Sequence, residues 1–162
     1  MIKINEEFIS VTSEKAKNSP RRRMNFNFHK EDAATLQRML NAMEPDTYIQ
    51  PHKHENPDKT EAFFVLRGKL LVVEFDNTGQ IAAHMILDAE KGNFGAEIAP
   101  RTWHTVISLE PGSVAYEVKD GPYDVTLDKF FAPWAPIEGK DDESRKLGIA
   151  FNAKILKALE LD

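Results

Sequence analysis

The segment PDTYIQPHKHENPDKTEAFFVLRG, residues 45–68, places two histidines just before a strongly apolar run. His52 and His54 are one residue apart, so on an extended chain both side chains point to the same side. Glu61 begins the run EAFFVL, on the face whose alternate residues are apolar. A carboxylate that faces an apolar interior is costly unless it is paired or bound to a cation. If the two strands pair antiparallel, Glu61 returns beside the histidines, where all three side chains can hold one metal ion.

Strand-like runs recur at short intervals around this segment. They are EAFFVL, KLLVVEF, GQIAAHMIL, FGAEIAP, TWHTVISL and SVAYEVK, and turn signals such as DNTG, EKGN and EPGS separate them. Strands spaced in this way, without helices between them, are typical of an antiparallel sandwich or barrel. Helical patterns occur at the two ends. We therefore expect one domain over residues 1–162, with an N-terminal helix in 1–20, a β-barrel over 21–138 and a C-terminal helix in 139–162.

Composition excludes several classes of partner and of site. The 162 residues carry a net charge of −5, which disfavours nucleic acid or an anionic membrane as the main partner. Cysteine is absent, so any metal must be held by nitrogen and oxygen ligands. The first residues do not resemble a signal peptide, and no apolar run approaches the roughly 20 residues that span a bilayer. We expect a cytoplasmic protein.

His104, in PRTWHTVISL, could supply a fourth ligand from a distant strand. Imidazole nitrogen and carboxylate oxygen together suit zinc, iron, manganese, nickel or cobalt. In an octahedral shell, four protein ligands would leave two positions for water or substrate. The spacing alone also fits a plainer interpretation, in which the His-x-His pair lies on a surface loop, Glu61 at a sheet edge and His104 in a hydrogen-bonded core position.

Two motifs resemble those of the cupin superfamily. The first is carried by Asp46, His52, His54, Glu61 and Gly68, and the second, less closely, by Pro100 and His104. In the first motif Asp46 replaces a glycine, and the interval between His54 and Glu61 is longer than the usual one. In the second motif Ser108 replaces an asparagine, and the expected glycine is missing. These departures affect the turns more than the ligand residues.

Longer segments, among them SPRRRMNFNFH, QRMLNAMEPDTYIQPHKH and DKFFAPWAPIE, are similar to the WbuC family of cupin-fold metalloproteins. The resemblance implies an all-β fold, a cupin-type antiparallel jelly-roll β-barrel with short terminal helices. It also implies one divalent transition metal at His52, His54, Glu61 and His104. Members of the family often occur in bacterial loci for surface-polysaccharide synthesis, and cupins often dimerise, so the resemblance implies a role in that synthesis and a homodimer.

Several polar residues on strands are candidates for binding a substrate. Asn25 and His29 alternate with apolar residues, and their face either lines the barrel mouth and binds sugar hydroxyls or is simply solvated. Arg38 shares a strand face with leucines and needs an anionic partner, either Glu74, Glu117 or a ligand. A lone strand histidine, His84, is expected at the surface or in the core and not as a metal ligand.

Near the end of the predicted barrel, Glu117 and Lys119 alternate in VAYEVKDGPYD, with Tyr123 beyond them. If this face points inward, Glu117 and Tyr123 are candidate acid–base groups near the metal, and Lys119 is a candidate substrate-binding residue. The other interpretation is a strand end at the surface, held by salt bridges.

The sequence therefore predicts a metal-binding cupin, a metal-dependent enzyme that acts on a small polar metabolite such as a sugar or a nucleotide sugar. Isomerisation, epimerisation, hydrolysis and oxygenation all remain open. The alternative is a non-catalytic module that binds or senses a small-molecule ligand, since this fold hosts both kinds of function.

Overall fold

The computed structural model describes residues 1–161, which form two α-helices, one short 3-10 helix and ten strands. The elements are α1 (Glu6–Lys17), β1 (Arg23–Asn27), β2 (Leu36–Met43), β3 (His52–Lys53), β4 (Glu61–Arg67), β5 (Leu70–Phe75), β6 (Ile81–Leu87), η1 (Ala89–Lys91), β7 (Gly95–Ile98), β8 (Trp103–Ser108), β9 (Ser113–Asp120), β10 (Phe130–Phe131) and α2 (Asp142–Ala158).

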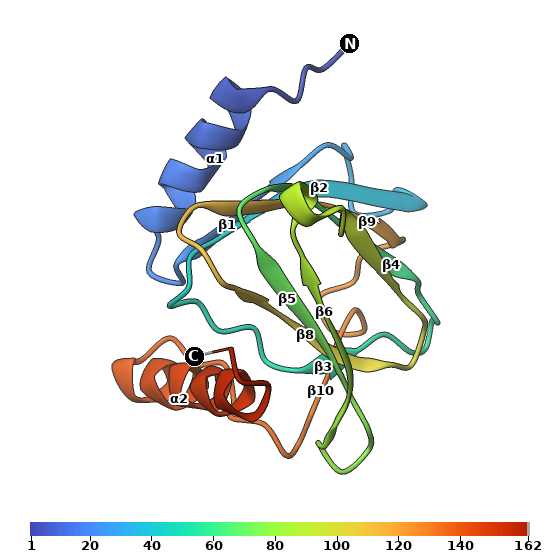
Figure 1. Cartoon of the computed structure of the whole chain (residues 1–162). Coiled ribbons are helices and arrows are strands. Elements are labelled where there is room, and N and C mark those ends of the chain that lie inside the picture. The colour runs from blue at the N-terminus through green and yellow to red at the C-terminus, as the bar shows by residue number, and fades with distance from the viewer. Residues whose placement is uncertain (162) are drawn as a thin grey trace.

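The strands form two antiparallel sheets of five strands each, which lie face to face (Figure 1). The first sheet has the order β1-β2-β9-β4-β7, and the second has the order β10-β3-β8-β5-β6. Apart from the consecutive pairs β1-β2 and β5-β6, neighbouring strands are not consecutive in the chain, as is typical of a jelly roll. The predicted all-β jelly roll with a helix at each end is confirmed.

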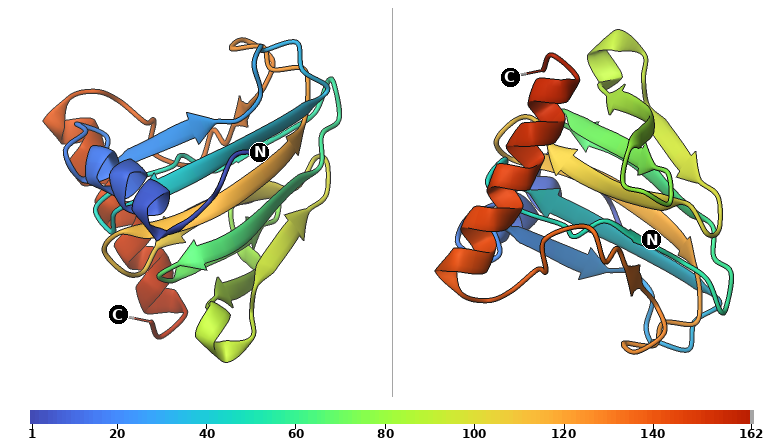
Figure 2. Two further views of the ribbon diagram at one scale, coloured as in Figure 1. Left: turned by 90° about the horizontal axis from the view of Figure 1, so that it is seen from above. Right: turned by 90° about the horizontal axis from the view of Figure 1, so that it is seen from below.

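The residues of each strand alternate between the space inside the two sheets and an outer face. In β5, Leu70 and Val72 belong to the core between the sheets, whereas Leu71 and Val73 point to the outer side of the second sheet. All four side chains are buried. An outer face this apolar needs a cover, and the terminal helices supply one for each sheet (Figure 2).

Helix α1 covers the outer face of the first sheet. Asn5 caps it by accepting a hydrogen bond from the backbone N–H of Phe8. Ile9 and Ala16 pack in one buried cluster with Leu40 and residues of β9. The apolar face of β1 is turned to this helix, and its polar face is therefore turned inward.

Helix α2 covers the outer face of the second sheet. Asp141 caps it by accepting a hydrogen bond from the backbone N–H of Ser144. Ile155 is buried with the outward residues of β5 and β8, and Phe151 packs beside it. None of the helices among the described residues has the length and apolar character needed to cross a membrane.

One prediction about strand pairing is wrong. The strand that holds His52 does not pair with the strand that begins at Glu61, because β3 pairs with β8 and β10 in the second sheet. Strand β4 pairs with β7 and β9 in the first sheet. The physical reason is that the seven-residue β4, with its alternating burial, finds full-length partners in the first sheet, which the two-residue β3 cannot offer. The predicted site therefore spans both sheets.

Candidate metal centre

Four buried side chains converge from the two sheets. In the second sheet His52 of β3 lies directly opposite His104 of β8, and His54 follows the end of β3. Glu61 is the first residue of β4 in the first sheet. Each of the four can direct one ligand atom to a group whose atoms all lie within 4.8 Å of one another. The sequence prediction that these residues meet is confirmed by a different route, across the sheets.

The backbone fixes the orientation of all three imidazole rings. The Nδ1–H of His52 donates to the carbonyl of Gln50 at 2.9 Å, and that of His104 donates to the carbonyl of Thr102 at 2.9 Å. The Nδ1–H of His54 donates to the carbonyl of Asp128. A neutral imidazole that donates from Nδ1 keeps a lone pair on Nε2. Each ring therefore presents Nε2 as its free ligand atom.

These Nε2 atoms meet a carboxylate that also carries lone pairs. The Oε2 atom of Glu61 lies 2.9 Å from Nε2 of His104 and 3.1 Å from Nε2 of His54. Nε2 of His52 is buried and has no hydrogen-bond partner among the described residues. Buried polar atoms are rarely left in this state. A cation held among the four atoms would satisfy every one of them, so the residues fit a bound metal ion.

The chemistry of the donor set narrows the choice of metal. Three imidazole nitrogens and one carboxylate oxygen suit a divalent transition metal, whereas Ca²⁺ and Mg²⁺ prefer oxygen ligands alone. The backbone carbonyls on Nδ1 are the kind of outer partner that orients metal-binding histidines in proteins.

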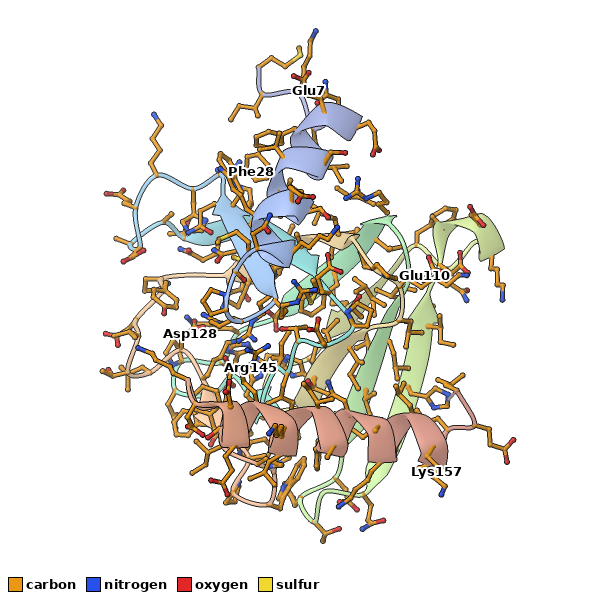
Figure 3. The ribbon with its side chains drawn as sticks, turned by 90° about the vertical axis from the view of Figure 1, so that its left-hand side faces the viewer. Glu7, Phe28, Glu110, Asp128, Arg145 and Lys157 are labelled. Carbon is orange, nitrogen blue, oxygen red and sulfur yellow. The ribbon has the colours of Figure 1, made fainter. Side chains whose placement is uncertain are left out.

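A cavity of about 880 Å³ opens beside this group, between the two sheets. His52, Glu61 and His104 lie on its wall, so three of the four candidate ligands face the space a small molecule would occupy. Figure 3 views the molecule from the side on which the first residues of α2, including Arg145, lie near the loop that carries Asp128. This volume lies within the range of small-molecule pockets.

A second layer of charged groups comes from β9 and the loop after it. Glu117 and Lys119 share the inward face of the first sheet with Glu61 and line the cavity. The amide of Asn41 donates to Glu117. Asp128 accepts from the ammonium groups of both Lys59 and Lys119, at 2.7 Å each. Glu117 and Lys119 therefore point inward and do not form a surface strand end.

The two neighbouring carboxyl groups have opposite pKa shifts. Burial raises the pKa of Glu61, but the contacts with the imidazoles of His104 and His54 outweigh burial and hold that pKa well below its usual range. Burial raises the pKa of Glu117, and the negative charge of Glu61 raises it further. Environments that separate the pKa values of two adjacent carboxyl groups are common at functional sites.

The structure also brings the predicted residues of β1 and of the late loop to the cavity. Asn25 and His29 line it, on the polar face that β1 turns away from α1. Nδ1 of His29 lies 3.1 Å from both the backbone nitrogen and the carbonyl oxygen of Arg38, which leaves Nε2 as the other polar atom of the ring. Tyr123 lines the cavity too, half exposed, with its ring 6.0 Å from the ammonium of Lys119. Whether these residues bind a substrate stays a prediction.

Two other strand residues lie outside this cavity. Arg38 is on the opposite face of β2 from the cavity, where a guanidinium N–H approaches the carbonyl of Phe28 at 3.5 Å. Arg38 forms no ion pair with either expected acid among the described residues. Glu117 faces inward, and Glu74 lies in the other sheet. His84 is exposed on β6, as predicted for a residue that is not a ligand.

Sequence reasoning missed three charged residues of the site. Lys59 and Asp128 form a buried ion pair, and Lys129 lines the cavity. Each lies in a polar loop, where a charged residue is usually solvated. The only available signal was the motif Asp-Lys just before the aromatic pair FF, and it does not distinguish a buried pair from an exposed one.

Comparison with family models gives one match. Residues 4–87 match the model described as "Domain of unknown function (DUF6016)". This range holds α1 and the strands up to β6, including three of the four candidate ligands. A comparison with curated proteins gave no match.

Solved structures share the fold at low sequence identity. KdgF from Halomonas sp. aligns with 68% of this chain and 88% of its own, with a TM-score of 0.51 and 15% identity. The capsular polysaccharide assembling protein CapF from Staphylococcus aureus aligns with 67% of this chain, with a TM-score of 0.54 and 20% identity, and this chain spans only 29% of CapF. L-ribose isomerase from Cellulomonas parahominis aligns with 68% of this chain and 69% of its own, with a TM-score of 0.52 and 14% identity. These are cupin-fold proteins, and the similarity shows that the jelly roll is of the cupin type.

Proposed function

This chain belongs to the DUF6016 family, a domain of unknown function, and from its site we propose a metal-dependent enzyme that acts on a small polar metabolite such as a sugar or a nucleotide sugar. The observation that carries the proposal is the convergence of three imidazoles and one carboxylate, with His52, Glu61 and His104 on the wall of a cavity of about 880 Å³. A buried set of ligand atoms that reaches an open cavity suits catalysis better than a closed structural site does.

His52, His54, Glu61 and His104 would hold one divalent transition metal. Such an ion supplies Lewis-acid polarisation of a bound carbonyl or hydroxyl oxygen. The chain's own residues supply the proton transfer and the orientation of the substrate. Glu117, fixed by Asn41 and facing the cavity, is the candidate that moves a proton to or from the substrate. Tyr123, at the edge of the cavity, is the second candidate for proton transfer.

The polar cavity wall also supports a hydroxylated ligand. Asn25 and His29 offer an amide and an imidazole to the cavity, and such groups bind sugar hydroxyls by hydrogen bonds. Lys119 lines the cavity beside them, but its ammonium is already paired with Asp128, so we propose that it acts mainly through the position of that loop.

The biological setting we propose is bacterial surface-polysaccharide synthesis, in a cytoplasmic homodimer related to the WbuC cupins. The segments that resemble WbuC support this setting. It is also supported by the descriptions of two proteins of similar fold, one as a capsular polysaccharide assembling protein and the other as a sugar isomerase.

Metal analysis tests the site first. Untagged protein, purified without a nickel column, is analysed by mass spectrometry beside the double variant His52→Ala/His54→Ala and the control variant His84→Ala. We expect near-stoichiometric transition metal in the wild type and in the control, and its loss in the double variant. Equal metal in all three proteins contradicts the site, as does a wild type that takes up none of the five candidate ions on titration.

Turnover tests the reaction. The loaded protein is incubated with a panel of free sugars and nucleotide sugars, and products are followed by NMR; an iron-loaded protein is also assayed for O₂ consumption. Once an activity is found, Glu117→Gln and Tyr123→Phe should each lower kcat by about 10²-fold or more, since general acid–base groups contribute about that much. An unchanged kcat refutes the acid–base roles, and ligand binding without any turnover favours the binding module.

A further inference from the structure

Lys129 brings a positive charge into the cavity that the protein itself does not pair. Lys129 lines the cavity, and its ammonium forms no ion pair within 4.0 Å among residues 1–161. The ammonium of Lys119, by contrast, is paired with Asp128. The titratable groups whose charge acts on Lys129 are Glu61, Glu117, Asp128 and Lys119. Burial lowers the pKa of the ammonium of Lys129, which is half-buried, as expected for a cation partly removed from water.

The carboxylates around Lys129 are already engaged. Glu61 faces the rings of His54 and His104, and Asp128 is held by two other lysines. Glu117 accepts from Asn41.

The acids nearer the mouth of the cavity are either paired with an arginine or exposed. Asp46 pairs with Arg22 and Glu138 with Arg23, and Asp32 is exposed at the rim. Among the described residues, no acid in the cavity wall forms an ion pair with Lys129 within 4.0 Å.

The loop that carries Lys129 is fixed on both sides. The preceding residue, Asp128, is held by its two ion pairs and by the hydrogen bond that its carbonyl accepts from His54. The following residue, Phe130, pairs with Lys53 where β10 meets β3. A side chain on such a fixed backbone has a defined place, so Lys129 is preorganised to contact a ligand.

We propose that Lys129 binds an anionic oxygen group of the substrate, a carboxylate or a phosphate, beside the metal centre. The substrate is then a charged metabolite and not a neutral sugar. This inference rests on the proposed function, whose site it shares. Lys140 and Arg145, at the start of α2, also line the cavity without an ion pair among the described residues, and they add to the positive field at its mouth.

Minimal anions test the site without knowledge of the substrate. Inorganic phosphate and acetate are titrated into ¹⁵N-labelled protein and followed by NMR, with glycerol as the neutral probe. The proteins are the wild type, Lys129→Met, Lys129→Arg and Lys157→Met, a matched control at the far, exposed end of α2 (Figure 3).

We expect at least one of the two anions to bind the wild type and to shift amides near Lys129, and glycerol to shift none. Lys129→Met should weaken anion binding by about tenfold or more, because a hydrogen bond to a charged group is lost. Lys129→Arg should keep binding within about threefold, since it keeps the charge. Lys157→Met should match the wild type. The Arg variant also guards against a Met variant that fails to fold.

The double variant His52→Ala/His54→Ala separates this inference from the proposed function, because it removes the metal and keeps Lys129. Anion binding that survives there and is lost in Lys129→Met supports the anion site. Anion binding that is lost in the double variant and kept in Lys129→Met means that the anion binds the metal, which overturns the inference while the metal site stands. Equal binding in the wild type and Lys129→Met, or equal loss in Lys157→Met, overturns it as well.

Discussion

The space between the two sheets has two ends of opposite character. At the polar end, Glu61 and His104 face each other across the sheets. At the apolar end, Val65 and Val106 lie in the buried core on the same strand faces, only two or four residues further along β4 and β8. The strand period is the same throughout, so the change in chemistry is not a change in fold. The apolar end stabilises the barrel, and the polar end uses part of that stability to hold charged groups away from water.

The largest effect is expected where buried charge depends on one residue. Asp128→Asn leaves the ammonium groups of Lys59 and Lys119 buried without a carboxylate, and it should cost about 3–5 kcal/mol of unfolding free energy. Urea denaturation at pH 7 measures the loss. The control is Asp124→Asn, an exposed acid in the same loop. If the two variants are equally stable, the polar end is less dependent on its ion pairs than the structure indicates.

The difference in stability between the wild type and Asp128→Asn should also depend on pH. Burial raises the pKa of Asp128, but the ammonium groups of Lys119 and Lys59 outweigh burial and hold it below the usual range. The ion pairs therefore contribute fully above the unfolded pKa of about 3.9 and lose their contribution as the pH falls through the lower, folded value. The stability difference between wild type and Asp128→Asn should shrink on acidification below pH 4. A difference that is constant with pH contradicts the assignment.

The next largest loss of stability is expected at the apolar end. Leu70→Ala removes a fully buried side chain from the core between the sheets and should cost about 3 kcal/mol. Leu66→Ala, at a residue 40% exposed on β4, is the matched control and should cost less than about 1 kcal/mol. Chemical denaturation of the metal-free proteins compares them. Similar costs would show that the core is not where the structure places it.

A smaller effect is expected when the polar end is made apolar. His52→Leu removes a buried Nε2 atom without a partner, at the cost of one hydrogen bond to Gln50, so the metal-free protein should keep its stability within about 1 kcal/mol. The increase in melting temperature on metal addition should disappear, because bound ligand stabilises only a protein that binds it. Thermal unfolding with and without metal, after EDTA treatment, measures both. A retained metal-dependent increase excludes His52 as a ligand.

The smallest effect is expected at His84. It is exposed on β6, so His84→Ala should change stability by no more than about 0.5 kcal/mol and should leave the metal content unchanged. Mass spectrometry and urea denaturation check the two quantities. A loss of metal would extend the polar end beyond the four residues described above.

The candidate ligands could be predicted from local sequence patterns. The His-x-His spacing, the acid at the start of an apolar strand and the distant His104 were enough to identify the candidate ligands, because each pattern depends on the period of a single strand. Their grouping across two sheets could not be predicted in the same way, since it depends on which strands pair, and the two-residue strand that carries His52 holds little pairing information.

The residues that the sequence misplaced or missed are ones whose position depends on tertiary contacts. Arg38 lies away from the cavity because it is on the outer face of β2, which packs under α1. The alternation of Arg38 with leucines could not predict which face of the strand points inward. Asp128 and Lys129 were missed because a loop has no period that marks a buried side. In each case the deciding contact joins residues far apart in the chain.

The three carbonyls that orient the imidazole rings belong to Gln50, Thr102 and Asp128. Every amino acid supplies the same carbonyl, so no single substitution at these positions deletes the acceptor. Ring orientation is thus buffered against point mutation, even at Asp128, whose side chain is constrained separately by its two ion pairs. Insertions and deletions are different, because they shift the main chain itself. Over evolutionary time, sequence divergence in these loops should be tolerated where changes of loop length are not.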